Sequence, residues 1–278
     1  MLPRGCSGTV RSQHQYSDPG VFPVSNSTER FSSRVGDYAR YRPSYPAGAI
    51  ALLQERCGLG PRAVVADIGS GTGILTALLL PHAAQVFAVE PNDPMRAAAD
   101  ASLGGDPRFV SVRGTAEATT LAPGSVDLLV AGQAFHWFKV APARAEALRI
   151  TRPGAFGALL WNEHPTRGSA FLADYERLLR RHASEFEAVL RSRVDEPAMR
   201  EYLGGAMECV RFPNQQSFDY EGLRGRLMSS SYAPEPGHPE HLPLIRGLEA
   251  VFARHQRDGR ILFPYVTLVY FGRLRDPA

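Results

Sequence analysis

The stretch that decides the fold reads Val64-Val-Ala-Asp-Ile-Gly-Ser-Gly-Thr-Gly73 and leads into the run Ile74-Leu-Thr-Ala-Leu-Leu-Leu80. Its first residues are apolar and rich in β-branched side chains, which is typical of a parallel strand buried on both faces. The glycine cluster then gives way to helix-forming residues, which end at Pro81. A second apolar run, residues 85–89, leads to the acid Glu90. This order of strand, glycine loop, helix, strand and acid predicts a nucleotide-binding βαβ unit.

Each residue type in this unit has a physical reason. Glycines let a strand turn sharply into a helix and let a ligand approach the backbone N–H groups. An acid at the end of the next strand, about 20 residues further on, can accept both hydroxyls of a ribose. A dinucleotide loop needs another glycine where this chain has Ile74, and a P-loop needs a lysine, whereas the only lysine here is Lys139. The predicted ligand is therefore a nucleoside without a pyrophosphate.

The glycine cluster with its two flanking acids resembles the first two motifs of the class I S-adenosylmethionine-dependent methyltransferases. The resemblance implies that the cofactor is S-adenosylmethionine, which leaves as S-adenosylhomocysteine. It places the first acid near the methionine end of the cofactor, the glycines beneath it, and the second acid on the ribose. The alternative is a Rossmann-like domain that has lost its ligand. The implied cofactor contacts in this unit are Asp67, Gly69, Ser70, Gly71, Gly73, Glu90, Pro91 and Met95. For Met95, which would lie against the adenine, packing in the core is an equally good interpretation.

The N-terminal part divides into an extension and a second motif. Residues 1–28 are rich in Ser, Gly, Pro and Gln without apolar periodicity, and we expect a flexible extension, with a transit peptide as the alternative. Residues 29–46 contain Tyr38-Ala-Arg-Tyr-Arg42-Pro-Ser-Tyr-Pro, which resembles a segment of the small-molecule branch related to the trans-aconitate methyltransferases. The resemblance implies a lid over the cofactor, with Tyr38 and Arg42 near its carboxylate. A guanidinium suits a carboxylate because it can bind both oxygens.

Two later strand ends carry further candidates. Ala116 and Glu117 follow the strand 109–112, where the family contacts adenine, although Thr115 stands where an Asp is frequent. The strand 126–131 opens onto Gln133-Ala-Phe-His136-Trp, which also resembles the same branch. Side chains at the carboxyl ends of strands face the ligand in open α/β sheets.

The residues that follow the strand 126–131 have distinct predicted roles. Gln133 is a predicted ligand contact. His136 is a predicted substrate contact or general base, because its ordinary pKa is about 6.5. The alternative is that His136 and Trp137 only shape the cofactor pocket. Glu163 and His164 follow the strand 156–161 and are secondary catalytic candidates, with a solvated loop as the alternative.

The predicted fold is α/β, with a Rossmann-like seven-stranded methyltransferase sheet that is mostly parallel and has an antiparallel last strand. Residues 29–278 form the methyltransferase domain, in which 29–46 are the lid and 165–203 with 218–258 are helical cap insertions. The remaining strands are expected at 207–212 and 261–270. Substrate specificity is expected to reside in the cap.

Composition bounds the function. The net charge of +3, carried by scattered arginines, does not favour a nucleic-acid partner. The three cysteines are far apart and form neither a disulfide framework nor a metal-ligand pattern, so we expect no metal site and a cytoplasmic location. No apolar run approaches the length of a membrane span, so no membrane partner is expected.

These patterns predict an enzyme that transfers a methyl group from S-adenosylmethionine to a small organic molecule, such as a secondary metabolite or an organic acid. Methyl transfer from a sulfonium is an in-line displacement, so the protein must chiefly align the reactants and exclude water. One alternative is a cyclase or isomerase that uses the cofactor without transferring its methyl group. The sequence leaves the acceptor and the oligomeric state open.

Overall fold

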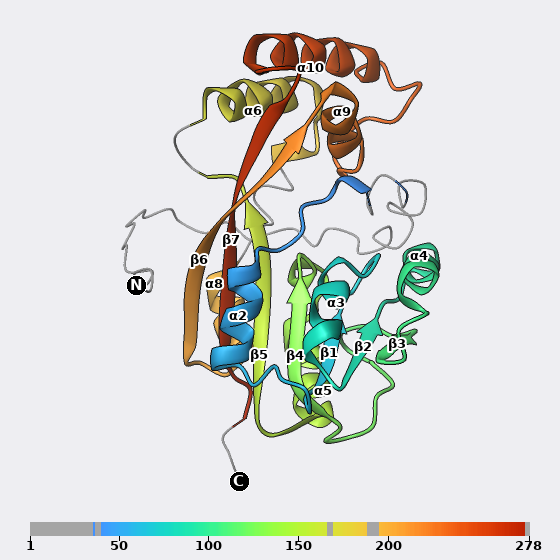
Figure 1. The fold of residues 1–278 in the computed structure, drawn as a ribbon, viewed down its shortest axis with the longest axis vertical. Helices are drawn as coiled ribbons and strands as arrows, with labels where there is room; N and C mark the ends of the chain where they lie inside the picture. The colour runs from blue at the N-terminus through green and yellow to red at the C-terminus, as the bar shows by residue number, and fades with distance from the viewer. Residues whose placement is uncertain (1–35, 37–39, 166–168, 188–194, 276–278) are drawn as a thin grey trace.

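Seven strands form a single sheet in the order β3-β2-β1-β4-β5-β7-β6. The computed structural model describes residues 36, 40–165, 169–187 and 195–275 (Figure 1). Strands β1 to β5 pair in parallel, and β7 runs antiparallel to both β5 and β6, which confirms the predicted fold class. The strands are β1 (Val64–Ile68), β2 (Gln85–Val89), β3 (Phe109–Val112), β4 (Val126–Gly132), β5 (Thr151–Glu163), β6 (Met207–Phe218) and β7 (Ile261–Arg273).

Helices cover both faces of this sheet. Alternate residues of a strand point to opposite faces, and in β1 Val65 belongs to one hydrophobic core while Ala66 belongs to another. The first core also contains side chains of α2 (Ala47–Arg56) and α3 (Ile74–Leu79), and the second contains side chains of α5 (Val140–Ile150) and α8 (Glu196–Leu203). Helix α4 (Asp93–Leu103) follows β2 and begins at Asn92, whose side chain accepts a hydrogen bond from the N–H of Met95.

A third hydrophobic core lies beyond the end of this sheet, in a part that we call the cap. Strands β6 and β7 continue past the other strands and are flanked there by α6 (Ala170–His182), α9 (Tyr220–Met228) and α10 (His241–His255) (Figure 1). The rings of Phe171, Tyr175 and Phe263 pack together at the centre of this core, with centroids between 5.3 and 5.7 Å apart. Each of these three side chains is buried.

The cap differs in its limits from the ranges predicted from the sequence. Strand β6 does not end at residue 212 but continues to Phe218. Pro213 lies within it, and this is tolerated because β6 is an edge strand, where a missing N–H breaks no ladder bond on the open side. Of the predicted insertion 165–203, α6 belongs to the cap, whereas α8 packs beside α5 under the sheet.

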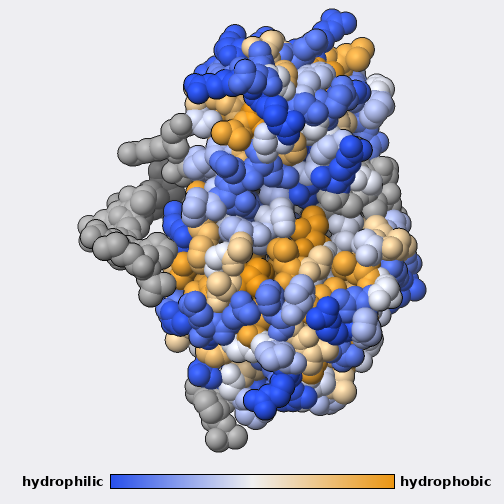
Figure 2. All heavy atoms as spheres, in the orientation of Figure 1, coloured by the Kyte–Doolittle hydropathy of each residue, from blue (hydrophilic) through white to orange (hydrophobic). Residues whose placement is uncertain are grey.

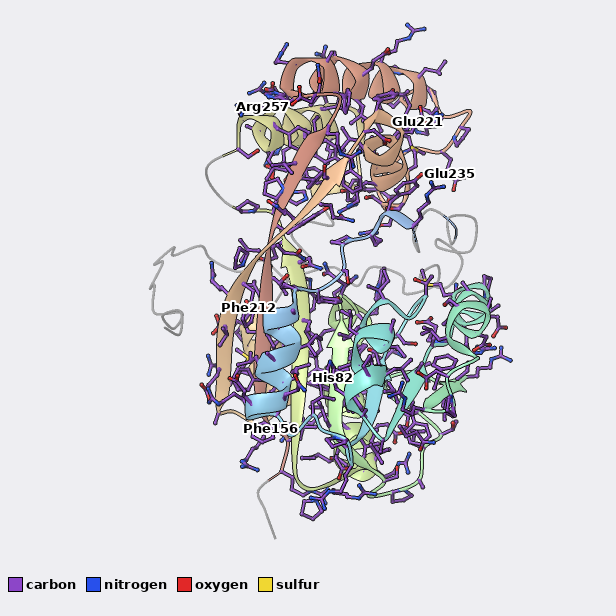
Figure 3. All side chains as sticks on the ribbon, viewed as in Figure 1. His82, Phe156, Phe212, Glu221, Glu235 and Arg257 are labelled. Atoms are coloured by element: carbon purple, nitrogen blue, oxygen red, sulfur yellow. The ribbon has the colours of Figure 1, made fainter. Side chains whose placement is uncertain are left out.

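The surface follows the same division. On the face that Figure 2 shows, hydrophilic residues dominate the cap, whereas hydrophobic residues gather below it around α2 and α3. Figure 3 places Phe212 of β6 against α2, where its ring lies 3.0 Å from the position that a Cβ on Gly48 would take. No helix in the part of the chain that the structure describes is long and apolar enough to cross a membrane.

Candidate functional site

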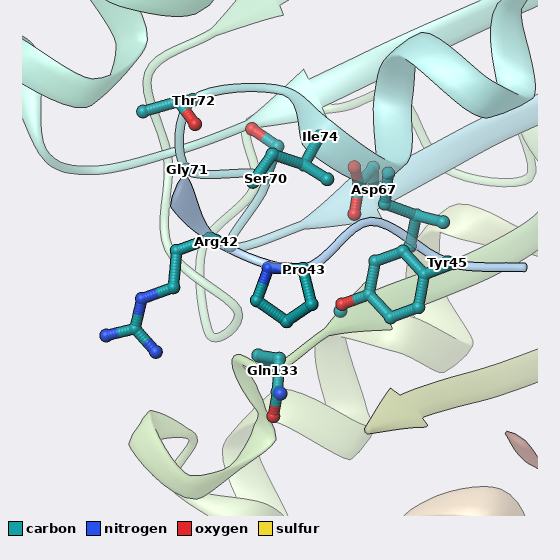
Figure 4. A pocket seen from close by; sticks show the side chains of 12 residues that line it. Arg42, Pro43, Tyr45, Asp67, Ser70, Gly71, Thr72, Ile74 and Gln133 are labelled. Carbon is teal, nitrogen blue, oxygen red and sulfur yellow. The ribbon is translucent and has the colours of Figure 1, made fainter. Parts of the chain in front are cut away.

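A pocket opens at the carboxyl ends of β1 and β4, on the side of the sheet edge that faces the cap. These are the strands at which the order of the sheet reverses, and ligands of open α/β sheets bind at such a point. The pocket encloses about 470 Å³, including its open mouth. Its lining comes from the glycine loop, from the end of β4 and from the segment before α2 (Figure 4). The lining residues are Arg42, Pro43, Tyr45, Asp67, Gly69, Ser70, Gly71, Thr72, Ile74, Leu75, Gly132 and Gln133.

The glycines of the loop are required by its conformation and by close packing. Gly69 has a φ of 69°, and a Cβ there would lie 2.6 Å from the Cβ of Ala134. Gly73 has a φ of 84°, and a Cβ there would lie 2.6 Å from the side chain of Leu103. Gly73 does not line the pocket but forms the N-cap of α3. Its structural role is therefore to bring α3 close to α4.

Asp67 is a fully buried acid at the pocket. Its Oδ2 accepts a 2.6 Å hydrogen bond from the hydroxyl of Thr76, and its Oδ1 has no hydrogen-bond partner in the described chain. Burial raises the pKa of Asp67 to about 7, against the lowering effect of Thr76 and with a smaller upward contribution from Glu90. The buried hydroxyl oxygens of Ser70 and Thr72 also have no partner among the described residues. One pocket thus collects three buried polar atoms that no described protein group satisfies.

Glu90 follows β2 and hydrogen-bonds to the backbone of the glycine loop. Its Oε2 accepts from the N–H of Gly71 at 2.9 Å, and its Oε1 accepts from the N–H of Asn92 at 2.8 Å. Burial raises the pKa of Glu90, although these two backbone hydrogen bonds work in the opposite direction. Pro91 is half-buried. Met95 is buried, with its sulfur 3.8 Å from the position of a Cβ on Gly71. These residues adjoin Gly71 without appearing in the pocket lining.

The segment 41–45, before α2, lies between the pocket and the cap. Arg42 donates a 2.7 Å hydrogen bond from Nη2 to the carbonyl of Ser229, which follows α9. The amide of Asn162 donates to the carbonyl of Ser44 at 3.2 Å, and that of Asn214 donates to the same carbonyl at 2.8 Å. Hydrogen bonds to the cap and to the sheet therefore hold segment 41–45 in place. Tyr38, predicted as a cofactor contact, lies outside the described residues.

The remaining predicted cofactor contacts have different surroundings. Gln133 lines the pocket, adopts a φ of 56° and donates to the carbonyl of Asn162 at 3.0 Å. Ala116 is buried in the core below β4, and the carboxylate of Glu117 accepts from the N–H of Lys139 at 2.8 Å. Neither Ala116 nor Glu117 is among the pocket-lining residues, and their contact with adenine stays a prediction.

The three catalytic candidates do not line the described pocket. His136 is exposed on the short 3-10 helix η3 (Phe135–Trp137), with its ring centroid 4.6 Å from that of Trp137. Glu163 is the last residue of β5. The ring of His164 is directed to the cap, 5.3 Å from Phe263, and its Nδ1 is 3.5 Å from a carboxylate oxygen of Glu176. Their catalytic roles stay predictions.

The structure also adds residues that the sequence patterns missed. Pro43, Tyr45, Thr72 and Gly132 line the pocket. Thr72 lies inside the glycine motif and could have been found there. Thr76 holds Asp67 from the first turn of α3, a contact for which the sequence offers no spacing rule.

Comparison with known proteins agrees with this arrangement. A family model described as a methyltransferase domain matches residues 66–159. An uncharacterized methyltransferase-like protein of Schizosaccharomyces pombe is 30% identical over 254 residues, which cover 89% of this chain and 96% of that protein. An uncharacterized methyltransferase of Mycobacterium tuberculosis is 41% identical over 137 residues, and the match spans only about half of its length, 54%, and 49% of this chain.

The fold is shared with solved structures. The structure of a putative type II methyltransferase from Anaeromyxobacter dehalogenans superposes with a TM-score of 0.61 at 24% identity, covering 85% of this chain and 99% of the other. The near full-length match to the Schizosaccharomyces protein, the strand order and the glycine loop all agree. The chain belongs to the class I S-adenosylmethionine-dependent methyltransferases.

Proposed function

We propose that the protein binds S-adenosylmethionine in the pocket beside Asp67 and transfers its methyl group to a small organic molecule. The observation that carries the proposal is that Asp67, Ser70 and Thr72 each have a buried polar atom without a hydrogen-bond partner among the described residues. All three residues line a single pocket at the switch point of the sheet. A buried polar atom without a partner is rare and unfavourable in a folded protein. A ligand with an ammonium group and hydrogen-bonding oxygens would satisfy all three.

Residues in the pocket and beside it fit the parts of this cofactor by charge and hydrogen-bonding type. The ammonium of the methionyl group suits the carboxylate of Asp67, and the ribose hydroxyls suit Glu90. Each oxygen of Glu90 accepts one backbone hydrogen bond and retains room to accept another. Arg42, which lines the same pocket, suits the methionyl carboxylate.

When bound, the cofactor supplies an electrophilic methyl group on a sulfonium. The chain's own contribution is to orient the reactants and to keep water out. Segment 41–45 is suited to this role, because it is held against the pocket by amides of the sheet and of the cap. His136 remains the candidate for removing a proton from the acceptor.

A small acceptor is favoured by the position of the cap. Arg42, at the pocket, donates a hydrogen bond to the turn after α9, in the cap. An acceptor therefore has to fit between the pocket and the cap. A modest net charge argues against a nucleic-acid substrate. Membership of the branch related to the trans-aconitate methyltransferases stays a prediction.

Calorimetric titration with S-adenosylhomocysteine tests the cofactor assignment. The wild-type protein is expected to bind, and Glu90→Ala is expected to bind at least about tenfold more weakly, because charge-assisted hydrogen bonds contribute about 1.5–3 kcal/mol each. Glu55→Ala, at an exposed position of α2, is the matched control and should bind as the wild type does. Equal affinities of Glu90→Ala and the wild type would contradict the assignment.

A further inference from the structure

The cap contains a buried cation that forms no ion pair with any carboxylate of the described residues. Arg226, on α9, is only 6% exposed. Its Nε donates to the hydroxyl of Tyr265 at 3.0 Å, and its Nη1 donates to the hydroxyl of Ser230 at 3.0 Å. Its Nη2 makes no hydrogen bond to any group of the described chain, and none of the ion pairs of the described residues includes Arg226.

Phenols and aromatic faces surround this guanidinium. Burial works to lower the pKa of Arg226, whereas Tyr265, Tyr232 and Tyr175 work to raise it, and the net shift is upward. No carboxylate is among these groups. Phenols are neutral near pH 7, so they offer dipoles and ring faces but no opposite charge. Arg226 also lies 5.6 Å from the ring of Phe263, within cation–π range.

Beside Arg226 lies a second donor without a partner. The hydroxyl of Tyr175 is buried and makes no hydrogen bond within the described residues. Tyr175 interacts electrostatically with Arg226 and Arg42, so the three side chains lie in one cluster. The hydroxyl of Tyr265, in contrast, is satisfied, because it accepts from Arg226 and donates to Gln216 at 3.0 Å.

This cluster adjoins the cofactor pocket. Arg42 lines the pocket and donates to the carbonyl of Ser229, whereas Arg226 donates to the hydroxyl of the next residue, Ser230. The two arginines therefore meet at the same turn, one from the pocket side and one from the cap side. A molecule seated between the pocket and the cap would meet both.

We propose that Arg226 and Tyr175 form a binding site for an acidic group of the methyl acceptor, a carboxylate, phosphate or sulfonate. The inference rests on the proposed function, because it places the acceptor between the pocket and the cap. Two donors without an acceptor, one of them charged, favour an anion over a neutral group. A fixed guanidinium would also select acids over their amides, since a carboxylate offers two charged acceptor oxygens and an amide offers one neutral oxygen beside an NH2 donor.

A purely structural role for Arg226 makes a different prediction. If the guanidinium only held Tyr265 and Ser230 in place, its replacement by methionine would lower the thermal midpoint. If the guanidinium instead serves to bind an anion, it is an uncompensated buried charge in the protein without that anion. Removing such a charge stabilises a protein or leaves its stability unchanged. Arg226→Met is therefore expected to unfold no earlier than the wild type when no anion is added.

The test uses protein saturated with S-adenosylhomocysteine and measures the thermal midpoint against sodium succinate. Sodium chloride at equal ionic strength and neutral succinamide are the comparisons. A ligand that binds only the folded state raises the midpoint in proportion to its affinity. Wild type is expected to respond to succinate alone, and Arg226→Met is expected to show an apparent affinity at least about tenfold weaker.

Arg224→Met is the matched control, because Arg224 lies on the same helix but is exposed and paired with Glu221 at 3.6 Å. Figure 3 shows Glu221 on α9 in the cap. Arg224→Met should respond to succinate as the wild type does. Tyr175→Phe is the second variant, should Arg226→Met fail to fold. It removes only a hydroxyl without a partner, and it should keep the midpoint while weakening the response to succinate.

Three results would overturn the proposal. One is a response of the wild type to succinate no larger than to chloride. Another is an equal response in the wild type, Arg226→Met and Tyr175→Phe. The third is a loss of S-adenosylhomocysteine affinity in Arg226→Met, measured by calorimetry, which would reassign Arg226 to the cofactor. Failure of the wild type itself to bind S-adenosylhomocysteine would instead remove the proposed function, so the two failures can be told apart.

Discussion

Thr76 donates a 2.6 Å hydrogen bond to Oδ2 of Asp67, across the glycine loop from the first turn of α3 to the end of β1. The bond fixes the carboxylate, whereas Oδ1 accepts no hydrogen bond from any residue that the structure describes. Because Asp67 is fully buried, its pKa is raised to about 7. A carboxylate with one free oxygen and a pKa near neutrality is prepared to receive a cation.

Cofactor binding is expected to depend on the protonation of Asp67. An ammonium beside the carboxylate lowers its pKa, so binding below pH 7 should release a proton, and affinity should fall as the pH drops through about 7. Calorimetry at pH 6 in two buffers of different ionisation heat measures the proton release. Asp67→Asn should show none. Proton release by Asp67→Asn equal to that of the wild type would contradict the prediction.

The same group should affect the stability of the ligand-free protein. The folded pKa of Asp67 lies above its unfolded value of 3.8, so its contribution to stability is fully present below that value and is lost as the pH rises through about 7. Relative to Asp67→Asn, the wild type should lose up to roughly 4 kcal/mol between pH 4 and pH 8. Urea unfolding at several pH values measures this difference. Parallel pH profiles of the two proteins would show that Asp67 does not titrate in this way.

Thr76 and Thr72 should respond differently to replacement by valine. Thr76→Val leaves Oδ2 of Asp67 unsatisfied and should cost about 1–3 kcal/mol of stability. Thr72→Val removes a hydroxyl that has no partner, so stability should stay within about 0.5 kcal/mol while S-adenosylhomocysteine binds more weakly. Urea unfolding and calorimetry on both variants provide the two measurements. A large loss of stability in Thr72→Val would show that its hydroxyl is already used by the fold.

Gly69 should not tolerate alanine. A Cβ at this position would lie 2.6 Å from the Cβ of Ala134, in a backbone conformation with positive φ. Both the clash and the strain lower stability, by about 1–3 kcal/mol each. Gly60→Ala is the matched control, since nothing lies within 4 Å of its Cβ position. Equal thermal midpoints of Gly69→Ala and Gly60→Ala would show that Gly69 is not required by the loop.

Asn162 is expected to act as a positioning residue for segment 41–45. Its amide donates to the carbonyl of Ser44, and its Oδ1 accepts from Asn214 at 3.1 Å. Asn162→Ala should weaken S-adenosylhomocysteine binding about tenfold and raise the rate of hydrogen exchange in this segment, because the buried partners lose their bonds. Gln215→Ala, exposed on β6, is the control. An unchanged rate of hydrogen exchange of segment 41–45 in Asn162→Ala would show that Asn162 does not position this segment.

The sequence predicted the parts of the site in which both the residue types and their spacing along the chain are typical of a cofactor site. The glycine loop with Asp67 before it and Glu90 after it is local, so strand and loop patterns are enough to place it. The mostly parallel seven-stranded sheet was predicted from the family resemblance that this motif carries, and the structure confirms it. Gln133, at the end of β4, was found from the rule that ligands lie at the carboxyl ends of strands.

Tertiary packing decided what the sequence could not predict. The strand predicted at 207–212 continues through Pro213 to Phe218, because the open edge of β6 requires no N–H there. The ring of His164 packs against Phe263, which is far along the chain, and no sequence pattern predicts this contact. Arg224 and Arg226 lie two residues apart in the sequence, and only burial distinguishes Arg226 from Arg224.

The most direct test of the proposed cofactor site is a crystal structure with S-adenosylhomocysteine. We expect the amino group of the ligand to lie within hydrogen-bonding distance of Oδ1 of Asp67, its ribose to contact Glu90, and its sulfur to face the cap. Ligand bound away from the glycine loop, or bound there with its amino group directed away from Asp67, would show that the proposed site is wrong.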